Sequence, residues 1–546
     1  MKNFFICDFF DFSRKFFKAF FAFFVLFFLN FSVFAEDVHY RWTPYKDSTG
    51  AEIWDGIWSE TYTDGTRSKA KFWSYWKESE SKWEKTFYND TGGTADYPGY
   101  YPDPNQKKLA YTYFTGEHAV TATLDSSPAN ELKELHIGDC YKATASSVGT
   151  KTITINLAGF ELKAKNLFLG SSSASVPSVD FALTGGGTLK VSGEMSFAAA
   201  SGVSCTYNIE VASGTVLDVS FIELNDSQAT VNFTGEGTLK AGNAIFSAGK
   251  ININVKNLEI SGTFKNEAGA TLSVSGLSSD SRTFGGTFEN AGTAEFSGGS
   301  KSSFVGAVTN SGSVKFKDSA EGIFNGTVKN SGRLGFSDKA TGTFAQDFIN
   351  NAGGAVSFAG TPKGTFNGAV TNATGGIFGF SGSAEGTFSE TVKNSGIFGF
   401  LGTASGTFAQ DFINNAGGAV SFSGTAKGTF NGAVTNATGE IFGFSDSAEG
   451  TFNGTVKNSG TLGFSGSAEG TFSSAFSNSG TVDLENASSQ IKFDGSFTNS
   501  GMVNSSGLCA VTFANHPVTD GGTWIYTGGI TPGEVILTNI LYKILI

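Results

Sequence analysis

The second half of the chain repeats a unit of about 20–22 residues, and this period restricts the fold more than any other feature. A fixed period in this range is typical of solenoids, in which every repeat forms one coil of a continuous stack. Each unit begins with Gly-Thr-Phe or a close variant, so we expect the leading phenylalanines to form one core column. They are Phe284, Phe304, Phe324, Phe344, Phe366, Phe388, Phe408, Phe430, Phe452 and Phe472.

Within one unit, the large apolar residues lie at even separations. Counted from Phe452, they are Val456, Leu462 and Phe464. Because alternate side chains of a strand share a face, this pattern predicts short strands with one buried face. Asn-Ser-Gly at 458–460 is a turn signal, so we expect two or three short strands in each coil.

The longer units support this interpretation. They carry two extra residues after a corner asparagine, for example after Asn436, and similar additions follow Asn350 and Asn372. One added residue would turn the next strand inside out, whereas two keep Phe442 and Phe444 on the inner face. The preference for even additions therefore favours strands over helices.

The asparagine at the corner of each coil allows two interpretations. It would either form an inward ladder, in which each amide bonds the next, or accept the left-handed backbone angle of a turn. Of the two, we favour the turn. The residues concerned include Asn310, Asn330, Asn394, Asn458 and Asn478.

A longer repeat is superimposed on the coils. The segment at 406–415 is identical to the segment at 342–351, and the offset, 406 − 342 = 64, equals three coils. Such near-identity indicates segmental duplication, so the number of coils is adjustable. This suits a spacer or a display rod better than one fixed active site.

The pattern of residues 1–35 predicts a secretory signal peptide. Basic residues precede an apolar run from 19 to 34, and Val33-Phe34-Ala35 offers a small-residue cleavage site. We favour a cleaved signal over a membrane anchor, because a span needs ~20 apolar residues.

The charge of the chain after this segment is strongly negative. Residues 1–35 hold four of the 37 basic and two of the 49 acidic residues, so the rest of the chain carries 37 − 4 = 33 basic and 49 − 2 = 47 acidic residues. This balance argues against nucleic acid as a partner.

Residues 36–118 differ in composition, since they hold six of the seven tryptophans. One interpretation is an aromatic-rich cap or small domain that covers the open end of a solenoid. The other is a sugar-stacking surface. We favour the cap, and the candidate ligand residues of the second interpretation are Trp54, Trp58, Trp73 and Trp76.

The remaining chain divides into three parts. Alternating strands continue through residues 119–261 without a strict repeat, and we interpret them as irregular coils of the same solenoid. Residues 262–507 contain the regular Gly/Asn/Phe repeats. We interpret residues 508–546 as closing strands or a truncated end.

Two patterns resemble a known group of proteins. Residues 154–160, followed by Gly-Thr-Leu strands such as 187–189, resemble the right-handed β-helices of the pectate-lyase-like superfamily. The Gly/Asn/Ser-rich units behind a signal peptide resemble passenger regions of bacterial autotransporters and related adhesins. The resemblance implies parallel β-coils of right hand, secretion and display at the cell surface. The residues after Cys509 are too few for the translocator barrel, which needs at least eight strands.

The sequence contains no recognisable catalytic or metal motif. His39, His118, His136 and His516 lack metal-ligand spacing, and there is no CxxC. A Cys140–Cys205 disulfide is left open. One set of acidic residues lies at odd distances from the repeat phenylalanines, which predicts solvated outward charges rather than a catalytic group: Glu321, Glu385, Glu449 and Glu469.

We therefore expect an all-β parallel β-solenoid of about 20–22 residues per coil that is not an enzyme and needs no cofactor. Its expected role is that of an adhesin, display rod or structural surface protein, secreted or associated with the outer membrane. It would meet a host or environmental surface ligand, with glycans as candidates. The alternative is a β-helix protein that binds or cleaves polysaccharide.

Overall fold

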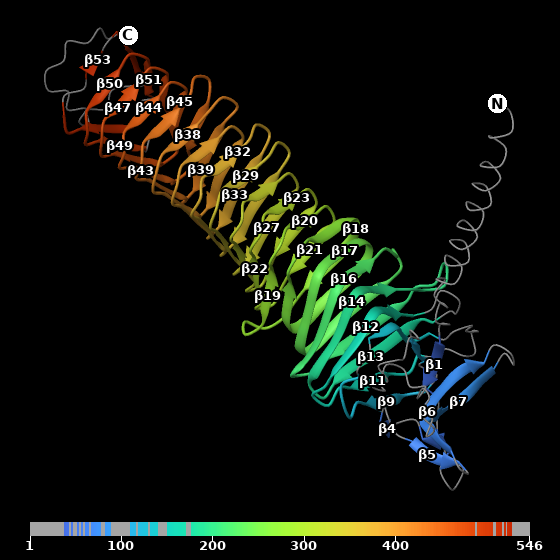
Figure 1. Ribbon diagram of the computed structural model, residues 1–546. Helices are drawn as coiled ribbons and strands as arrows, with labels where there is room; N and C mark the ends of the chain where they lie inside the picture. The colour runs from blue at the N-terminus through green and yellow to red at the C-terminus, as the bar shows by residue number, and fades with distance from the viewer. Residues whose placement is uncertain are drawn as a thin grey trace, which may run out of the picture.

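The computed structural model describes residues 110–115, 118–128, 131–139, 150–170, 176–485, 489–505, 509–515, 518–519 and 521–526, and the backbone of strands between 38 and 88. Before residue 112, and at 485, 519 and 524–526, the description covers the backbone alone. The described chain is all-β without a helix, and it forms a parallel β-solenoid of about 17 turns over residues 112–513. Figure 1 shows this solenoid as a long, straight-sided rod.

Each regular coil contains three short strands, which continue into three parallel stacks. Stack A comprises β19 (Ser281–Phe284), β22 (Lys301–Phe304), β25 (Glu321–Phe324), β28 (Thr341–Phe344), β31 (Lys363–Phe366), β34 (Glu385–Phe388), β37 (Ser405–Phe408), β40 (Lys427–Phe430), β43 (Glu449–Phe452), β46 (Glu469–Phe472), β49 (Gln490–Phe493) and β52 (Ala510–Phe513).

Stack B follows after a tight corner. It comprises β20 (Phe288–Asn290), β23 (Val308–Asn310), β26 (Val328–Asn330), β29 (Phe348–Asn350), β32 (Val370–Asn372), β35 (Val392–Asn394), β38 (Phe412–Asn414), β41 (Val434–Asn436), β44 (Val456–Asn458), β47 (Phe476–Asn478), β50 (Phe497–Asn499) and β53 (Val518–Thr519).

Stack C completes each coil. It comprises β21 (Thr293–Phe296), β24 (Ser313–Phe316), β27 (Arg333–Asp338), β30 (Ala355–Gly360), β33 (Ile377–Gly382), β36 (Ile397–Gly402), β39 (Ala419–Gly424), β42 (Ile441–Phe444), β45 (Thr461–Ser465), β48 (Thr481–Glu485), β51 (Met502–Ser505) and β54 (Thr523–Tyr526).

The same stacks begin in longer, irregular strands before β19. Stack B starts with β8 (Ala110–Phe114) and β10 (Leu132–Ile137), whereas β12 (Glu161–Leu169), β14 (Gly187–Phe197) and β16 (Thr215–Leu224) run from stack A into stack B. Stack C starts with β9 (Val120–Thr123), β11 (Ile153–Asn156), β13 (Ser178–Thr184) and β15 (Thr206–Val211). β17 (Thr230–Ile260) and β18 (Phe264–Val274) connect these coils to the regular ones.

The N-terminal strands extend the first coil. β1 (Val38–Trp42) pairs in parallel with β8, and β4 (Gly56–Ile57) pairs in parallel with β9. β6 (Arg67–Lys77) pairs antiparallel with β1, β5 (Thr61–Asp64) and β7 (Lys82–Tyr88). β2 (Tyr45–Lys46) and β3 (Glu52–Ile53) pair with each other. The backbone edges of β8 and β9 are therefore occupied by N-terminal strands.

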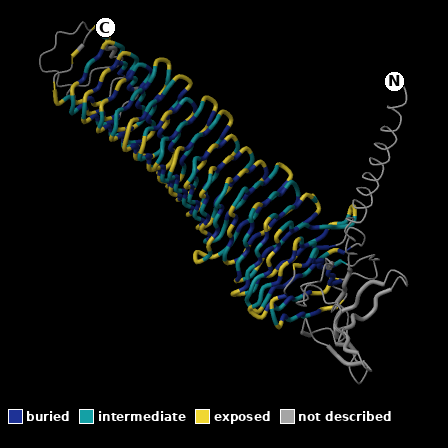
Figure 2. The backbone as a smooth tube through the Cα atoms, viewed as in Figure 1, coloured by how far each residue is buried: buried dark blue, intermediate teal, exposed yellow. Residues whose placement is uncertain are grey.

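The leading phenylalanines of the repeat form one buried column in stack A. Phe324 and Phe344 stack with ring centroids 4.6 Å apart and planes 6° from parallel, and Phe344 stacks on Phe366 in the same way at 4.6 Å. The column continues beyond the expected repeat to Phe493 and Phe513. A second ladder of stacked rings runs through stack C, from Phe296 to Phe464. Figure 2 shows buried residues recurring along the coils through the length of the rod.

The favoured interpretation of the corner asparagines as left-handed turn residues is wrong. Among the described residues, positive φ angles outside glycine occur only at Ala158, Asp318, Asp338 and Asp446. The asparagines instead lie buried inside the solenoid and form the ladder that was the second alternative. Asn394 Nδ2 donates to Asn414 Oδ1 at 2.8 Å, and equivalent bonds of 2.7–2.9 Å join every neighbour from Asn266 to Asn499.

Each ladder asparagine also holds the corner between stacks B and C. Asn394 Nδ2 donates to the carbonyl oxygen of Gly396, 3.0 Å away, and Asn310 Nδ2 donates to the carbonyl oxygen of Arg333 in the next coil at 2.8 Å. Apart from Asn266 Oδ1 at the start of the ladder, which is buried without a hydrogen-bond partner, the amides are thus satisfied without water at a place where the backbone turns sharply. Burial of a polar side chain is acceptable here because its hydrogen bonds are made inside the protein.

Coil length changes only at corners. In the first of the longer coils, Asn330 pairs with Asn350 but Arg333 pairs with Ala355, so the two extra residues lie between stacks B and C, as expected. A coil with a single extra residue is also present, since Phe464 pairs with Leu484 and Glu469 with Gln490. The expectation that one extra residue turns the next strand inside out is therefore wrong for a corner, which absorbs it before the strand begins.

Candidate functional site: the outer faces of the solenoid

The interior of the regular coils is packed too tightly to hold a ligand. On stack A, the position two residues before each phenylalanine is a buried glycine from Gly322 to Gly470. A Cβ atom on Gly386 would lie 2.8 Å from the Phe380 ring and 3.0 Å from the Phe388 ring. Functional chemistry in these coils is therefore confined to the outward side chains.

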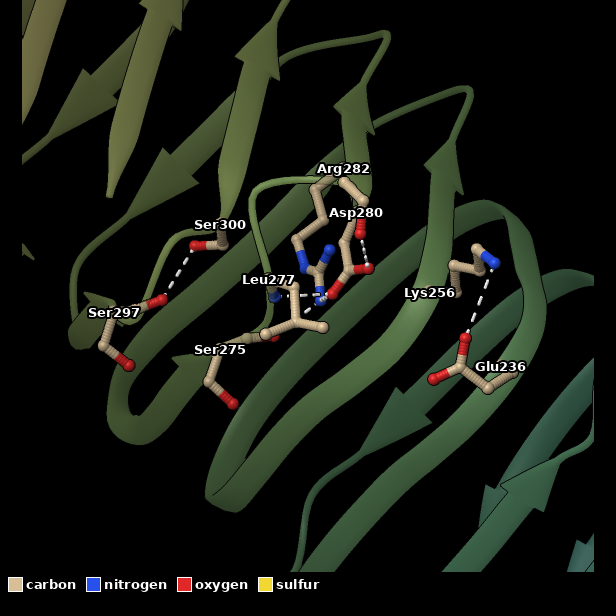
Figure 3. A network of polar contacts seen from close by, with 9 residues as sticks. Glu236, Lys256, Ser275, Leu277, Asp280, Arg282, Ser297 and Ser300 are labelled. Atoms are coloured by element: carbon tan, nitrogen blue, oxygen red, sulfur yellow. Dashed lines mark hydrogen bonds and ion pairs between the residues drawn. The ribbon is translucent and has the colours of Figure 1, made fainter. Parts of the chain in front are cut away.

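One buried charge lies at the junction between the irregular and the regular coils (Figure 3). Arg282 takes the position between Leu258 and Ser302 in stack A, and its side chain has no exposed surface. Its Nη2 donates to the carbonyl oxygen of Ser275 at 2.6 Å and lies 3.4 Å from Asp280 Oδ2. Burial lowers the pKa of the guanidinium, and Asp280 opposes that shift. The contacts tie Arg282 to the loop around Leu277, so we assign it a structural role.

A second buried polar group lies in the first coils. The His136 ring stacks between Tyr113 and Phe168, with centroids 4.4 and 4.8 Å away. Its ring nitrogens lie 2.8 Å from Glu134 Oε2 and 3.2 Å from Asp139 Oδ2. Burial alone would lower the pKa of His136, but the hydrogen bonds and charges of Asp139 and Glu134 outweigh it and raise the pKa.

The outer face of stack A carries charges in pairs. Glu321, Glu385 and Glu449 point outward, as expected, but each accepts an ion pair from a lysine one coil earlier. Lys427 Nζ, for example, lies 2.8 Å from Glu449 Oε2, and both side chains are about half exposed. The sequence interpretation missed these partners because it considered the acidic residues alone. The available signal was a lysine at the equivalent position of the preceding unit.

A row of threonines lies beside these pairs on stack A. They occupy the outward position before each core phenylalanine and are Thr343, Thr365, Thr387, Thr407, Thr429, Thr451 and Thr471.

The outer face of stack B repeats every three coils. Its single outward position holds Lys329, Lys393 and Lys457, which are all exposed and lie at the same place in successive copies of the three-coil repeat. Between them lie Ile349 with Thr371 and Ile413 with Thr435, so one short pattern is presented repeatedly along the rod.

The outer face of stack C is different, because its middle strands carry no charge. Four of the large hydrophobic side chains that are exposed in the described structure gather there: Ile377, Ile397, Leu401 and Ile441. The position between them is always glycine or serine in β30, β33, β36, β39, β42 and β45. The result is a flat and uncharged strip.

These observations do not test the sugar-stacking candidates. Trp54 and Trp58 lie outside the described residues. Trp73 and Trp76 lie in β6, where their backbones pair with Trp42 and Trp83, and their side chains are not described. The possible partner of Cys205, Cys140, also lies outside the described residues, whereas Cys205 is a buried free thiol whose pKa is raised by burial.

Two further observations concern the described part of the chain. Within it, no three His, Cys, Asp or Glu side chains gather as a metal ion would require. None of the residues that the structure describes belongs to a helix with the length and hydropathy needed to cross a bilayer.

Comparison with known proteins gives no assignment: no family model, no curated protein and no solved structure matches this chain.

Proposed function

We propose that this protein is an exported, non-catalytic rod that presents repeated contact surfaces outside the cell, as an adhesin or a structural surface protein does. The observation that carries the proposal is the continuity of the core. The two phenylalanine ladders and the asparagine ladder run through the regular coils, so bending the rod would break contacts in every coil it passes. Such a rod serves as a stiff spacer.

The outward side chains support a role in contact rather than in catalysis. The lysines of stack B recur every three coils, which corresponds to a spacing of about 14 Å, since neighbouring strands in a stack lie 4.7–4.9 Å apart. A ligand with repeating groups would meet several equivalent positions at once. Multiple weak contacts of this kind raise overall affinity without any one strong site.

Export is tested by fractionating bacteria that express the full chain with an epitope tag after Thr438, in an exposed corner. We expect labelling of intact cells or recovery from the medium, with the mature chain beginning near Glu36. Finding the tagged chain only in the cytosol with residues 1–35 attached would overturn the proposal.

The rod itself is tested with a deletion of residues 342–405, which removes three coils and joins Thr341 to Gly406 in register. Small-angle scattering should show a folded rod about 14 Å shorter, because each coil adds about 4.8 Å. Retention of expressing cells on mucin-coated wells should exceed that of cells without the chain. Equal retention would contradict a role in adhesion, while a collapsed deletion variant would contradict the modular rod.

A further inference from the structure

The uncharged strip on stack C has definite limits. We name it the neutral face and define it as the first and third residues, counted from the strand start, of β30, β33, β36, β39, β42 and β45, together with the fifth residue of each of these strands except the four-residue β42. The third position shows the limits clearly. It is Lys315 in β24 and Asp483 in β48, and between them it is glycine or serine in every strand.

The neutrality is local to this face. Through the same coils, stack A carries Lys363, Glu385, Lys427 and Glu449, and stack B carries Lys393. A low charge of the segment therefore does not explain it. Exposed apolar residues gathered in one region of a surface commonly mark an interaction site. A neutral strip offers nothing to a strongly charged partner, which excludes nucleic acid and anionic membrane as its occupants.

We propose that the neutral face binds a second copy of this chain, with the two rods antiparallel around a twofold axis that runs along β36. This axis places β33 on β39 of the second copy, β30 on β42 and β24 on β48. Because the axis is parallel to the strands, first positions face first positions and third positions face third positions. The proposal is independent of export.

The residues at these positions are complementary in size under that axis. Ile377 faces Ala419 of the second copy, and Ala355 faces its Ile441, so in these two pairs of first positions a large side chain meets a small one. At the third positions, Ser357 faces Gly443, and Gly379 faces Ser421. Ile397 and Leu401 meet their own copies at the axis and form the apolar centre. Two sheet faces with small residues can approach closely, as in dry sheet packing.

The charges at the ends are complementary as well. The same axis places Lys315 opposite Asp483 of the second copy, and symmetry makes this contact twice. Both residues are outward third positions, Lys315 exposed and Asp483 half-buried. A parallel arrangement of the rods would place lysine on lysine. The charges therefore specify direction and register, which the apolar centre alone would leave open.

The area of the face is sufficient for a reversible dimer. The nine strands from β24 to β48 give a length of about 38 Å and a width of roughly 17 Å at ordinary strand spacings, and hence about 1,300 Å² over both copies. Stable interfaces bury about 1,200–2,000 Å² in total, so this face lies at the lower end of that range.

The test is sedimentation of the purified full chain over micromolar concentrations, with Gly399→Lys as the disrupting variant. A Cβ on Gly399 has no heavy atom closer than 3.9 Å, so the fold tolerates a side chain there. At the axis, the new lysine meets its own copy, and we expect dimer affinity to fall about 100-fold. Thr387→Lys, on stack A, is the matched control and should leave the dimer unchanged.

Charge reversal tests the direction. Lys315→Glu and Asp483→Lys should each weaken the dimer, and the double variant should restore it, because the reversed charges face one another again. A wild-type chain that stays monomeric overturns the proposal, as does a dimer that Gly399→Lys does not affect. Failure of the double variant to restore the dimer overturns the antiparallel register. A monomer that binds cellulose or chitin particles, and loses this binding in Gly399→Lys, would reassign the face to neutral polysaccharide.

Discussion

The irregular coils before β19 and the regular coils after it share the same three stacks but fill them differently. In stack A, one inward position is leucine at Leu162, Leu189, Leu217, Leu239 and Leu258, and then becomes glycine from Gly322 onward. In stack B, the final inward position is Leu224 and Phe246 before it becomes the asparagine ladder at Asn266. The architecture therefore does not require phenylalanine or asparagine.

The difference explains why only one region repeats. An aliphatic side chain in the core needs only a neighbour of suitable volume in the next coil, so the irregular coils can differ in sequence and in length. One of them is 24 residues long, as the hydrogen-bonded outer residues Asn208 and Asn232 show. A ladder amide needs the same amide one coil away, because its donor and acceptor must both be satisfied. A stacked ring likewise needs a parallel ring. Identity between coils is thus a physical requirement of the regular region.

The largest expected effect follows from breaking a phenylalanine column. Phe388 packs between Phe366 and Phe408, with centroids 4.9 and 4.8 Å away. Phe388→Ala should lower the free energy of unfolding by about 3–5 kcal/mol, the usual cost of such a cavity. Urea unfolding measures it, with Thr387→Ala on the outer face as the control. Equal losses in the two variants would show that the column contributes no special stability.

A reciprocal exchange tests the ladder against the aliphatic core. Asn394→Leu removes the donor to Asn414 Oδ1 and the acceptor of one hydrogen bond from Asn372 Nδ2. It should lower the free energy of unfolding by about 2–4 kcal/mol, since each buried unpaired group costs about 1–3 kcal/mol.

Leu224→Asn makes the opposite change in the same stack and should also destabilise, because the new amide finds no neighbouring amide in Phe246. Hydrogen exchange in the altered coils would report both variants. If Asn394→Leu leaves stability unchanged, the ladder contributes only packing volume, and its hydrogen bonds add no net stability.

Glycine substitutions compare an inward position on stack A with an outward position on stack C. Gly386→Ala places a methyl group 2.8 Å from the Phe380 ring and should destabilise by about 1–3 kcal/mol through overpacking. Gly399→Ala, on the open outer face, should change stability little. Thermal unfolding of the two variants compares them directly, and equal values would contradict the assignment of inward and outward faces.

The smallest effect concerns pH and belongs to the irregular region. The folded-state pKa of His136 is raised, so protonated His136 contributes stability below its ordinary pKa of about 6.5, and this contribution is lost as pH rises through the folded value. The unfolding midpoint should fall over that window, and His136→Gln should remove the change. No histidine lies between 137 and 515, so the hydrogen-exchange protection factors of the regular coils, which correct for the intrinsic pH dependence of amide exchange, should stay constant. A change of protection in the regular coils would contradict the assignment of the pH effect to His136.

Much of the fold was predictable from the chain. The even spacing of Phe452, Val456 and Phe464 implied inward faces, and the two-residue additions after Asn350 implied a corner. The role of the asparagines was misjudged, since a turn and a ladder produce the same spacing along the chain. Only the parallel stacking of Asn394 on Asn414 distinguishes them.

The candidate surfaces were less predictable for the same reason. Glu449 was correctly placed outside, but its partner Lys427 lies one full coil earlier in the chain, a contact that depends on coil registration. Likewise, Ile377, Ile397 and Ile441 are isolated residues along the chain and become neighbours only after three coils have stacked.

By itself, the order of residues determined the period, the strands and the side of the strand on which each residue lies, because these depend on local spacing and on the alternation of side chains. The tertiary structure alone decided which coils lie in contact, which amides bond one another and where charge is missing from the surface. These are properties of neighbours about 20 residues apart, and they arise only when the backbone of one coil hydrogen-bonds to the next.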